Sequence, residues 1–149
     1  MLENYSKSVD VTATPEKVYK AITEQIDRWW TTKTNQATVV NDHLRVEFEG
    51  KGFAAMKVIK AIPNQSLTWE VLDACMGHKE QTKKDEWVGS YIQWLIQPQD
   101  NGCRIEMVHQ GLTSELECWD VCFKGWNYFL GSLKSFLDTG EGTPFSPDS

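Results

Sequence analysis

The sequence has few of the features that would place a protein in a class at once. Four cysteines in 149 residues are too few for a fold built on disulfides, and a chain of this length buries enough apolar surface without them. We interpret all four as buried thiols, at Cys75, Cys103, Cys118 and Cys122.

Membrane and export signals are also missing. No apolar run reaches the roughly 18 residues that a membrane-spanning helix needs. The first residues, MLENYSKSVDVTAT, lack the basic-then-apolar layout of a signal peptide. We therefore expect a cytoplasmic protein without membrane insertion, with one domain over residues 1–142 and an irregular tail at 143–149.

Positive charge is scarce as well. The net charge is −6 and the sequence pI is about 5.0, and after Cys75 there are 6 basic residues against 11 acidic ones. Basic residues do not cluster anywhere along the chain. Nucleic acids and anionic lipid surfaces both require a positive surface, so the sequence argues against either partner.

Motifs for nucleophilic or metal chemistry are not found. The chain has no Gly-x-Ser-x-Gly, no phosphate-binding glycine loop and no His-Glu-x-x-His. A zinc site usually needs two close ligand pairs, and only one such pair, Cys75 and His78, has the right spacing. We expect neither a metal nor a cofactor.

Local patterns predict the secondary structure. Val9 and Val11 alternate with polar residues, which indicates a strand. Thr14 is a good N-cap and Pro15 suits the first helical position, so a helix is expected from about residue 15 to 25. The sequence IDRWWTT then indicates a second short helical turn.

The middle of the chain predicts a run of antiparallel strands. HLRVEFEG alternates strictly, SLTWEVL does the same, and GFAAMKVIKAI alternates with a slip that suggests a bulge. SYIQWLI and CRIEMVH flank a turn and form a hairpin. The residues expected to face inward from these strands are Leu44, Val46, Phe48, Leu67, Trp69, Val71, Ile92, Trp94, Ile96, Ile105, Met107 and His109.

The C-terminal part predicts a long helix over residues 117–138 with Gly140 as its C-cap. Its apolar residues follow helical spacing, at Trp126, Phe129, Leu130, Leu133, Phe136 and Leu137. The fold class is therefore α+β, with an antiparallel sheet covered on one face by this helix. Periodicity leaves open whether the helix aromatics pack against a solid interior or a cavity.

Three pieces of the chain, in this order, carry a resemblance to a known family. They are VTATPEKVYKAIT leading to IDRWW, a hairpin that ends in HQGL, and GWNYFLGSLKSFLDTGEG. Together they resemble the Bet v 1-like superfamily, also called START-like or SRPBCC, over residues 5–142. The branch looks like that of the C-terminal domain of the heat-shock-protein-90 ATPase activator. Where that branch often has a Gly-Gly turn, this chain has Asn41, Asp42 and His43.

The resemblance implies a helix-grip fold, in which a curved sheet of about seven strands wraps around the C-terminal helix. It also implies an apolar cavity between sheet and helix, with an entrance near the short N-terminal helices. The superfamily's Rieske oxygenase branch is excluded, because its cluster-binding Cys and His pairs are not present.

The candidate ligand-binding residues lie on inward faces and are mostly large and apolar, which suits a ligand pocket as well as a core. They are Trp30, Phe48, Trp69, Trp94, Met107, His109, Trp126 and Leu130. Adjacent residues on a helical turn cannot both face inward, so one of Trp29 and Trp30 is expected at the rim. We assign the rim position, and a gating role, to Trp30.

Three functions are compatible with these observations. The first is non-catalytic binding of a small hydrophobic or aromatic molecule in the cavity. The second is a cyclase-like or hydrolase-like enzyme with His109 as acid or base, although an inward histidine is more often structural. The third is a module that contacts a chaperone, and a homodimer also remains open.

Overall fold

The structure is a computed structural model that describes residues 4–48, 52–75, 86–117 and 119–145. Its strands are β1 (Tyr5–Val11), β2 (His43–Glu47), β3 (Phe53–Ile62), β4 (Ser66–Cys75), β5 (Tyr91–Gln99) and β6 (Gly102–Gln110). Its helices are α1 (Pro15–Thr23), the single 3-10 turn η1 (Ile26–Arg28) and the long α2 (Trp119–Thr139).

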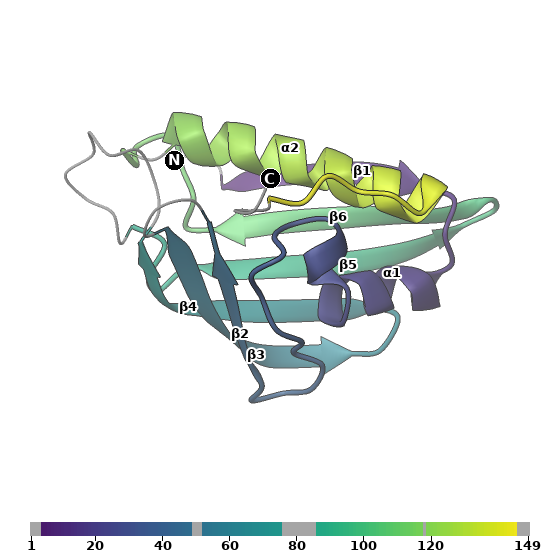
Figure 1. Ribbon diagram of the computed structural model, residues 1–149, viewed down its shortest axis with the longest axis horizontal. Coiled ribbons are helices and arrows are strands. Elements are labelled where there is room, and N and C mark those ends of the chain that lie inside the picture. Colours follow the sequence, from purple (N-terminus) through teal and green to yellow (C-terminus); the bar gives the residue numbers. More distant parts are fainter. Residues whose placement is uncertain (1–3, 49–51, 76–85, 118, 146–149) are drawn as a thin grey trace.

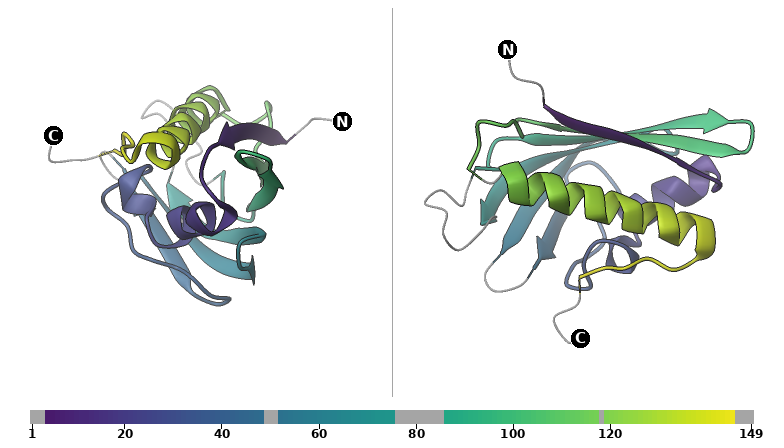
Figure 2. Two further views of the ribbon diagram at one scale, coloured as in Figure 1. Left: turned by 90° about the vertical axis from the view of Figure 1, so that its right-hand side faces the viewer. Right: turned by 90° about the horizontal axis from the view of Figure 1, so that it is seen from above.

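One antiparallel sheet forms the body of the domain. Its strand order is β1-β6-β5-β4-β3-β2, so every strand except β1 lies beside its neighbour in the sequence. The sheet curves around α2, which crosses its concave face, while α1 and η1 close one end (Figures 1 and 2). The predicted α+β helix-grip fold is confirmed, but the described sheet has six strands where about seven were expected.

After η1, residues 31–36 run along the free edge of β2. The side-chain amide of Asn35 donates to the carbonyl of His43 at 2.8 Å and accepts from the N–H of Arg45 at 2.9 Å. The hydroxyl of Thr34 donates to the carbonyl of Arg45 at 2.9 Å. Side chains therefore replace much of the backbone ladder, so the segment covers the edge without becoming a strand.

The hairpin of β5 and β6 has the predicted facing. Trp94 lies opposite Met107, and Ile92 lies opposite His109. All six side chains predicted to face inward from these strands are buried. The predicted irregularity in β3 is also present, as register shifts against β4 at Ala55/Met56 and at Val58/Lys60. The predicted polar loop after Cys75 lies mostly outside the described residues.

The helix predictions hold with small differences at the ends. Thr14 caps α1 by accepting a hydrogen bond from the N–H of Lys17 at 3.3 Å. The helix ends at Thr23 instead of Gln25, because Glu24 and Gln25 have φ values of −120° and −125°. At the end of α2, Gly140 has φ +91° and its N–H donates to Phe136, as expected of a C-cap.

The tail after α2 turns back across the domain (Figure 1). The N–H of Thr143 donates to Ser132 Oγ at 2.7 Å, and the N–H of Phe145 donates to the carbonyl of Trp30 at 2.8 Å. The N–H of Thr32 donates to the carbonyl of Phe145 at 2.9 Å. Residues 143–145, expected to be irregular, therefore lie against the segment that follows η1.

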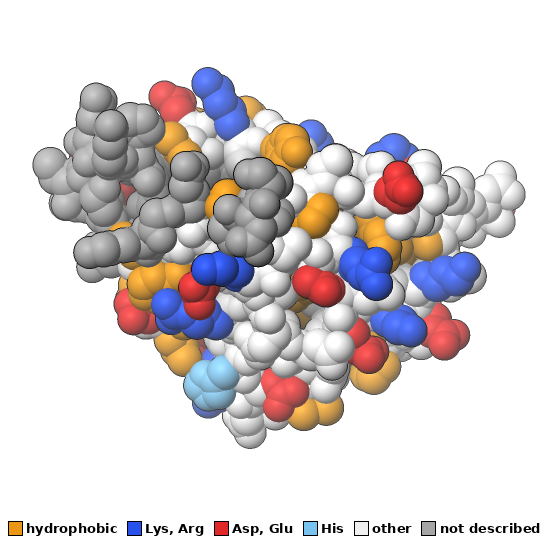
Figure 3. All heavy atoms as spheres, viewed as in Figure 1, with side chains coloured by type: hydrophobic (Ala, Val, Ile, Leu, Met, Phe, Trp, Pro, Cys, Tyr) orange, Lys and Arg blue, Asp and Glu red, His pale blue; other side chains and the backbone are white. Residues whose placement is uncertain are grey.

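The outer surface is mixed in character. On the face shown in Figure 3, basic and acidic side chains are interspersed with single apolar ones. Among the described residues, no helix has both the length and the apolar character needed to cross a bilayer.

Candidate functional site

Five tryptophans pack together between the sheet and α2, and we call this group the aromatic centre. Trp69 comes from β4, Trp94 from β5 and Trp126 from α2, while Trp29 and Trp30 follow η1. The ring of Trp30 lies 5.0 Å from that of Trp126 and 6.0 Å from that of Trp69. The rings of Trp69 and Trp94 are 5.7 Å apart.

The prediction that Trp30 lies at the rim is wrong. Trp29 and Trp30 are 0% and 2% exposed. The prediction assumed a helical turn, but the chain has left η1 by this point, and Trp29 has φ −136°. The two rings therefore stack on each other, with centroids 5.7 Å apart and planes 14° apart. Trp29 is fixed further by a hydrogen bond from its Nε1–H to the carbonyl of Ala21 at 2.9 Å.

The remaining candidate residues surround this centre. Met107, His109 and Leu130 are buried. Phe48 is half-buried and lies just beyond β2, with its ring 5.9 Å from that of Trp30 and 6.2 Å from that of Phe145. The structure thus brings all eight predicted residues into one core, with Phe48 at its edge.

The aromatic centre is closely packed in this structure. Trp69, Trp94, Met107 and His109 are 0% exposed. A side chain that lined an enclosed cavity large enough for water would have accessible surface. These four side chains have none, so they do not border such a cavity. The apolar cavity implied by the resemblance stays a prediction, and a ligand would have to move at least one ring to enter.

A chain of hydrogen bonds runs through His109. Indole nitrogen only donates, so Nε1–H of Trp126 donates to Nδ1 of His109 at 3.0 Å. The proton of the neutral ring is therefore on Nε2, which donates to Ser90 Oγ at 2.8 Å. The Ser90 hydroxyl in turn donates to the carbonyl of Trp87 at 2.5 Å. Each polar hydrogen in this chain has an acceptor.

The electrostatics of His109 match this arrangement. Burial lowers the pKa of His109 from 6.5 to about 3, so the ring is neutral at neutral pH. Its only lone pair on nitrogen, at Nδ1, is occupied by Trp126. Asn127, the residue after Trp126, accepts a hydrogen bond from the hydroxyl of Tyr5 at 2.6 Å. The geometry is that of a structural histidine, with no accessible site for proton transfer.

Sequence reasoning missed Ser90 and Trp87, which complete this chain. Ser90 directly precedes β5, and Ile92 pairs with His109 across the predicted hairpin. The register of that hairpin was therefore the available signal for Ser90. Trp87 also packs its ring 4.5 Å from His109, at 90°.

Two donors in the aromatic centre have no such acceptor. The indole N–H groups of Trp69 and Trp94 are buried and have no hydrogen-bond partner among the described residues. Leaving a buried donor unpaired costs about 1–3 kcal/mol. Native proteins rarely keep such groups, and two in adjacent rings mark a place where an acceptor is missing.

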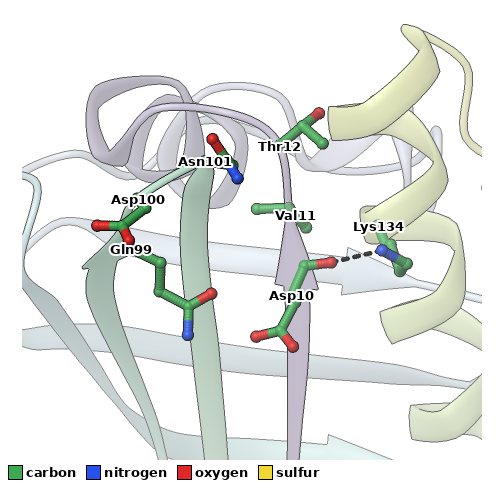
Figure 4. Close-up of a pocket in the computed structure, with 7 residues that line it drawn as sticks. All are labelled: Asp10, Val11, Thr12, Gln99, Asp100, Asn101 and Lys134. Carbon is green, nitrogen blue, oxygen red and sulfur yellow. Dashed lines mark hydrogen bonds between the residues drawn. The ribbon is translucent and has the colours of Figure 1, made fainter.

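A separate hollow of about 470 Å³ opens at the surface near the β5–β6 turn (Figure 4). Its lining residues are Asp10, Val11, Thr12, Gln99, Asp100, Asn101 and Lys134. The ammonium of Lys134 donates to the carbonyl of Asp10 and to the carboxylate of Asp138. The carboxylate of Asp10 pairs with Arg104 at 3.1 Å. These charged groups are already engaged with one another, so we assign no ligand to this hollow.

The thiols and possible metal ligands among the described residues add no site. Cys103 and Cys122 are buried as predicted, whereas Cys75 is half-buried, and Cys118 and His78 lie outside the described residues. Within the part of the chain that the structure describes, no three His, Cys, Asp or Glu side chains are placed to hold a metal ion.

Solved structures share this fold. The chain is similar to the solution structure of the Aha1 dimer from Colwellia psychrerythraea, with 28% identity, a TM-score of 0.77, and coverage of 93% of this chain and 98% of that one. A protein of Mesorhizobium loti is 18% identical with a TM-score of 0.73, covering 90% and 96% of the two chains. A protein of Chromobacterium violaceum is 14% identical with a TM-score of 0.72, covering 91% and 97%. No curated protein matches the chain.

A match to a family model gives a narrower assignment than the solved structures do. The family model described as activator of Hsp90 ATPase homolog 1-like protein matches residues 12–138, which is most of the chain and runs from the residue after β1 to the last turn of α2. The chain therefore belongs to the family of activator of Hsp90 ATPase homolog 1-like proteins, within the Bet v 1-like superfamily.

Proposed function

We propose that this domain binds a small apolar or aromatic molecule between the sheet and α2, without catalysis, and anchors it through the indole N–H groups of Trp69 and Trp94. The observation that carries the proposal is that both donors are buried and unpartnered among the described residues. An acceptor atom on a ligand would remove a cost of about 1–3 kcal/mol at each donor.

The surroundings fit such a ligand. Ligand pockets are mostly apolar, with a small number of polar groups that fix orientation. Here the apolar part is supplied by aromatic rings on the sheet, on α2 and after η1, together with Met107 and Leu130. The polar part is the pair of indole donors.

The structure gives no comparable support to catalysis at His109. Both of its ring nitrogens are hydrogen-bonded within the protein, and burial holds its pKa at about 3. A general base needs a free lone pair within reach of the substrate proton.

Native mass spectrometry of the purified protein tests the proposal, by comparison with the mass of the denatured chain. We expect a retained adduct, or a complex formed on adding apolar compounds that carry an acceptor. The double variant Trp69→Phe/Trp94→Phe keeps two aromatic rings but removes both donors, and it should lose the adduct. Trp119→Phe is the matched control, since Trp119 packs on Tyr5 outside the aromatic centre. Equal binding by both variants would refute the anchoring role.

A second candidate is contact with a protein partner, either a chaperone or a second copy of the chain. The family description names an Hsp90 ATPase activator, and the Colwellia relative is a dimer. Val121, Phe123 and Tyr128 are exposed on α2 and are available for such a contact. Sedimentation analysis tests self-association. The ATPase rate of an Hsp90-type chaperone, with and without this protein, tests the other partner.

We also propose a cytoplasmic location. The buried thiols of Cys103 and Cys122 fit a reducing compartment. Cell fractionation with an antibody against the protein tests it, and recovery outside the cytoplasmic fraction would contradict it.

A further inference from the structure

We infer that the ring of Trp30 is an internal plug, held in the slot that a neutral, planar, fused-ring ligand with a hydrogen-bond acceptor would occupy. This inference rests on the proposed function. It adds the class of ligand and the residue whose ring moves aside when the ligand binds.

The slot is the space that the Trp30 ring fills, and the rings around Trp30 define it. Its plane is 14° from that of Trp29 and 15° from that of Trp69, with centroids at 5.7 and 6.0 Å. Trp126 closes the slot from α2 at 5.0 Å, and Phe48 lies at 5.9 Å toward the edge of the core. A space that has two nearly parallel rings beside it accepts a flat group of the size of indole.

Trp30 is the ring in this centre with the least support. Trp69 and Trp94 stand on adjacent strands, and Trp126 stands on α2 with its N–H bonded to His109. Trp29 donates its indole hydrogen to Ala21. Trp30 belongs to no helix or strand, and its backbone is tied to Ile26 and to Phe145 in the tail.

A path outward exists next to Trp30. Phe48 and Phe145 are both half-buried, and their rings are 6.2 Å apart. Phe48 borders the ring of Trp30, so that ring can swing toward this edge when the tail residue moves. The other rings of the centre are enclosed by the sheet and α2.

The chemistry of the plug defines the chemistry of the ligand. An indole ring offers a donor and no acceptor on nitrogen, so Trp30 cannot satisfy the N–H groups of Trp69 and Trp94. A fused ring with a carbonyl oxygen or a pyridine-type nitrogen fills the same slot, and its acceptor would pair with Trp69, the unpartnered donor whose ring lies beside that of Trp30. The described residues of the centre include no charged side chain, and His109 is neutral, so an ionised ligand would lack a counter-charge.

Three bicyclic probes test this inference: quinoline with an acceptor, naphthalene with no polar group, and indole with a donor. Binding is measured by calorimetry, on the wild type and on Trp30→Leu, with Trp119→Leu as the control. We expect quinoline to bind about tenfold tighter than naphthalene, because it alone pairs a buried donor. We also expect every probe to bind Trp30→Leu more tightly than the wild type, because the slot is then vacant.

The outcomes separate the two proposals. If naphthalene binds as tightly as quinoline, the acceptor requirement is overturned while ligand binding stands. If Trp30→Leu and the wild type bind the probes equally tightly, the inference that Trp30 is a plug is overturned. If no probe binds either protein, both proposals fall. Should Trp30→Leu fail to fold, the wild type still decides: bound quinoline must shift the Trp30 ring signals in NMR spectra, and unshifted signals overturn the plug.

Discussion

His109, Trp69 and Trp94 lie in the same buried layer, but only the ring nitrogens of His109 have hydrogen-bond partners among the described residues. Both ring nitrogens of His109 are hydrogen-bonded, through a chain that runs from Trp126 to Ser90 and on to the backbone. The indole donors of Trp94 and Trp69, which lie one and two strands away in the sheet, have no partner among the described residues.

The comparison assigns a structural role to His109, and it leaves the proposed ligand-binding role to Trp69 and Trp94. A completed hydrogen-bond chain fixes the position of α2 on the sheet and leaves nothing for a ligand. Unpaired donors lower stability, and on our proposal a ligand supplies their acceptor. The histidine, which is the more conspicuous residue in the sequence, is on this reading the structural one.

The largest expected effect is that of His109→Leu. Leucine fills much of the space but leaves the indole N–H of Trp126 without its acceptor and Ser90 Oγ without the donor that it accepts from. We expect the free energy of unfolding to fall by about 3–5 kcal/mol in urea titrations. Met107→Leu is the control on the same strand face and should cost less than about 1.5 kcal/mol. Equal losses in the two variants would show that the hydrogen-bond chain adds nothing to packing.

A pH series tests the same residue without removing it. The pKa of His109 is 6.5 in the unfolded chain and about 3 in the folded protein. Between these pH values the unfolded state therefore binds one more proton than the folded state. The free energy of unfolding therefore has its full value above pH 6.5 and decreases as the pH falls below that value. The loss should reach about 2 kcal/mol at pH 5.0.

His109→Gln supplies the control for this series, because its amide can accept from Trp126 and donate to Ser90 but cannot titrate. Its stability should be nearly constant from pH 6.5 to 5.0. Hydrogen bonds from the backbone of Thr38 and Val39 lower the pKa of Asp42 below its ordinary 3.8, so Asp42 changes charge only below this range. A slope in His109→Gln as steep as in the wild type would contradict the assignment.

Replacing one tryptophan at a time by phenylalanine compares a paired donor with an unpaired one. Trp126→Phe and Trp94→Phe remove the same atoms from the same core. Only Trp126→Phe breaks a hydrogen bond, so it should cost about 1–2 kcal/mol more in free energy of unfolding. If Trp94→Phe costs as much, the Trp94 donor has a partner in solution.

The smallest expected effect concerns a paired hydroxyl at the edge of the core. The hydroxyl of Tyr5 donates to Asn127 Oδ1 at 2.6 Å, and burial raises the Tyr5 pKa to about 12. Tyr5→Phe should lower the free energy of unfolding by about 0.5–1 kcal/mol. A larger loss than in Trp126→Phe would reverse the ranking proposed for the core.

Much of this fold could be predicted because strands repeat every two residues. That period placed Trp94, Met107 and His109 on the inward face, and the N-cap at Thr14 placed the start of α1. Trp30 was placed wrongly because its backbone is no longer helical. The count of about seven strands came from the family resemblance, and the described sheet has six.

The unpaired donors could not be predicted at all. Whether a buried N–H has an acceptor depends on what the rest of the fold brings to within 3.5 Å of it. No spacing in the sequence records that Trp126 donates to His109 while the Trp94 donor has no acceptor among the described residues. Apart from Trp30, which was expected at the rim, the candidate residues were correctly expected to face inward, but their hydrogen bonds became visible only in three dimensions.

The decisive measurement is an NMR spectrum of the indole N–H groups, recorded without and with quinoline and assigned by single Trp→Phe variants. In the free protein, the Trp69 and Trp94 protons should lie upfield of those of Trp29 and Trp126, which are hydrogen-bonded. Quinoline should move at least one of the two downfield and leave Trp29 and Trp126 in place. Trp69 and Trp94 protons already at hydrogen-bonded positions, and unmoved by quinoline, would contradict ligand anchoring at this pair.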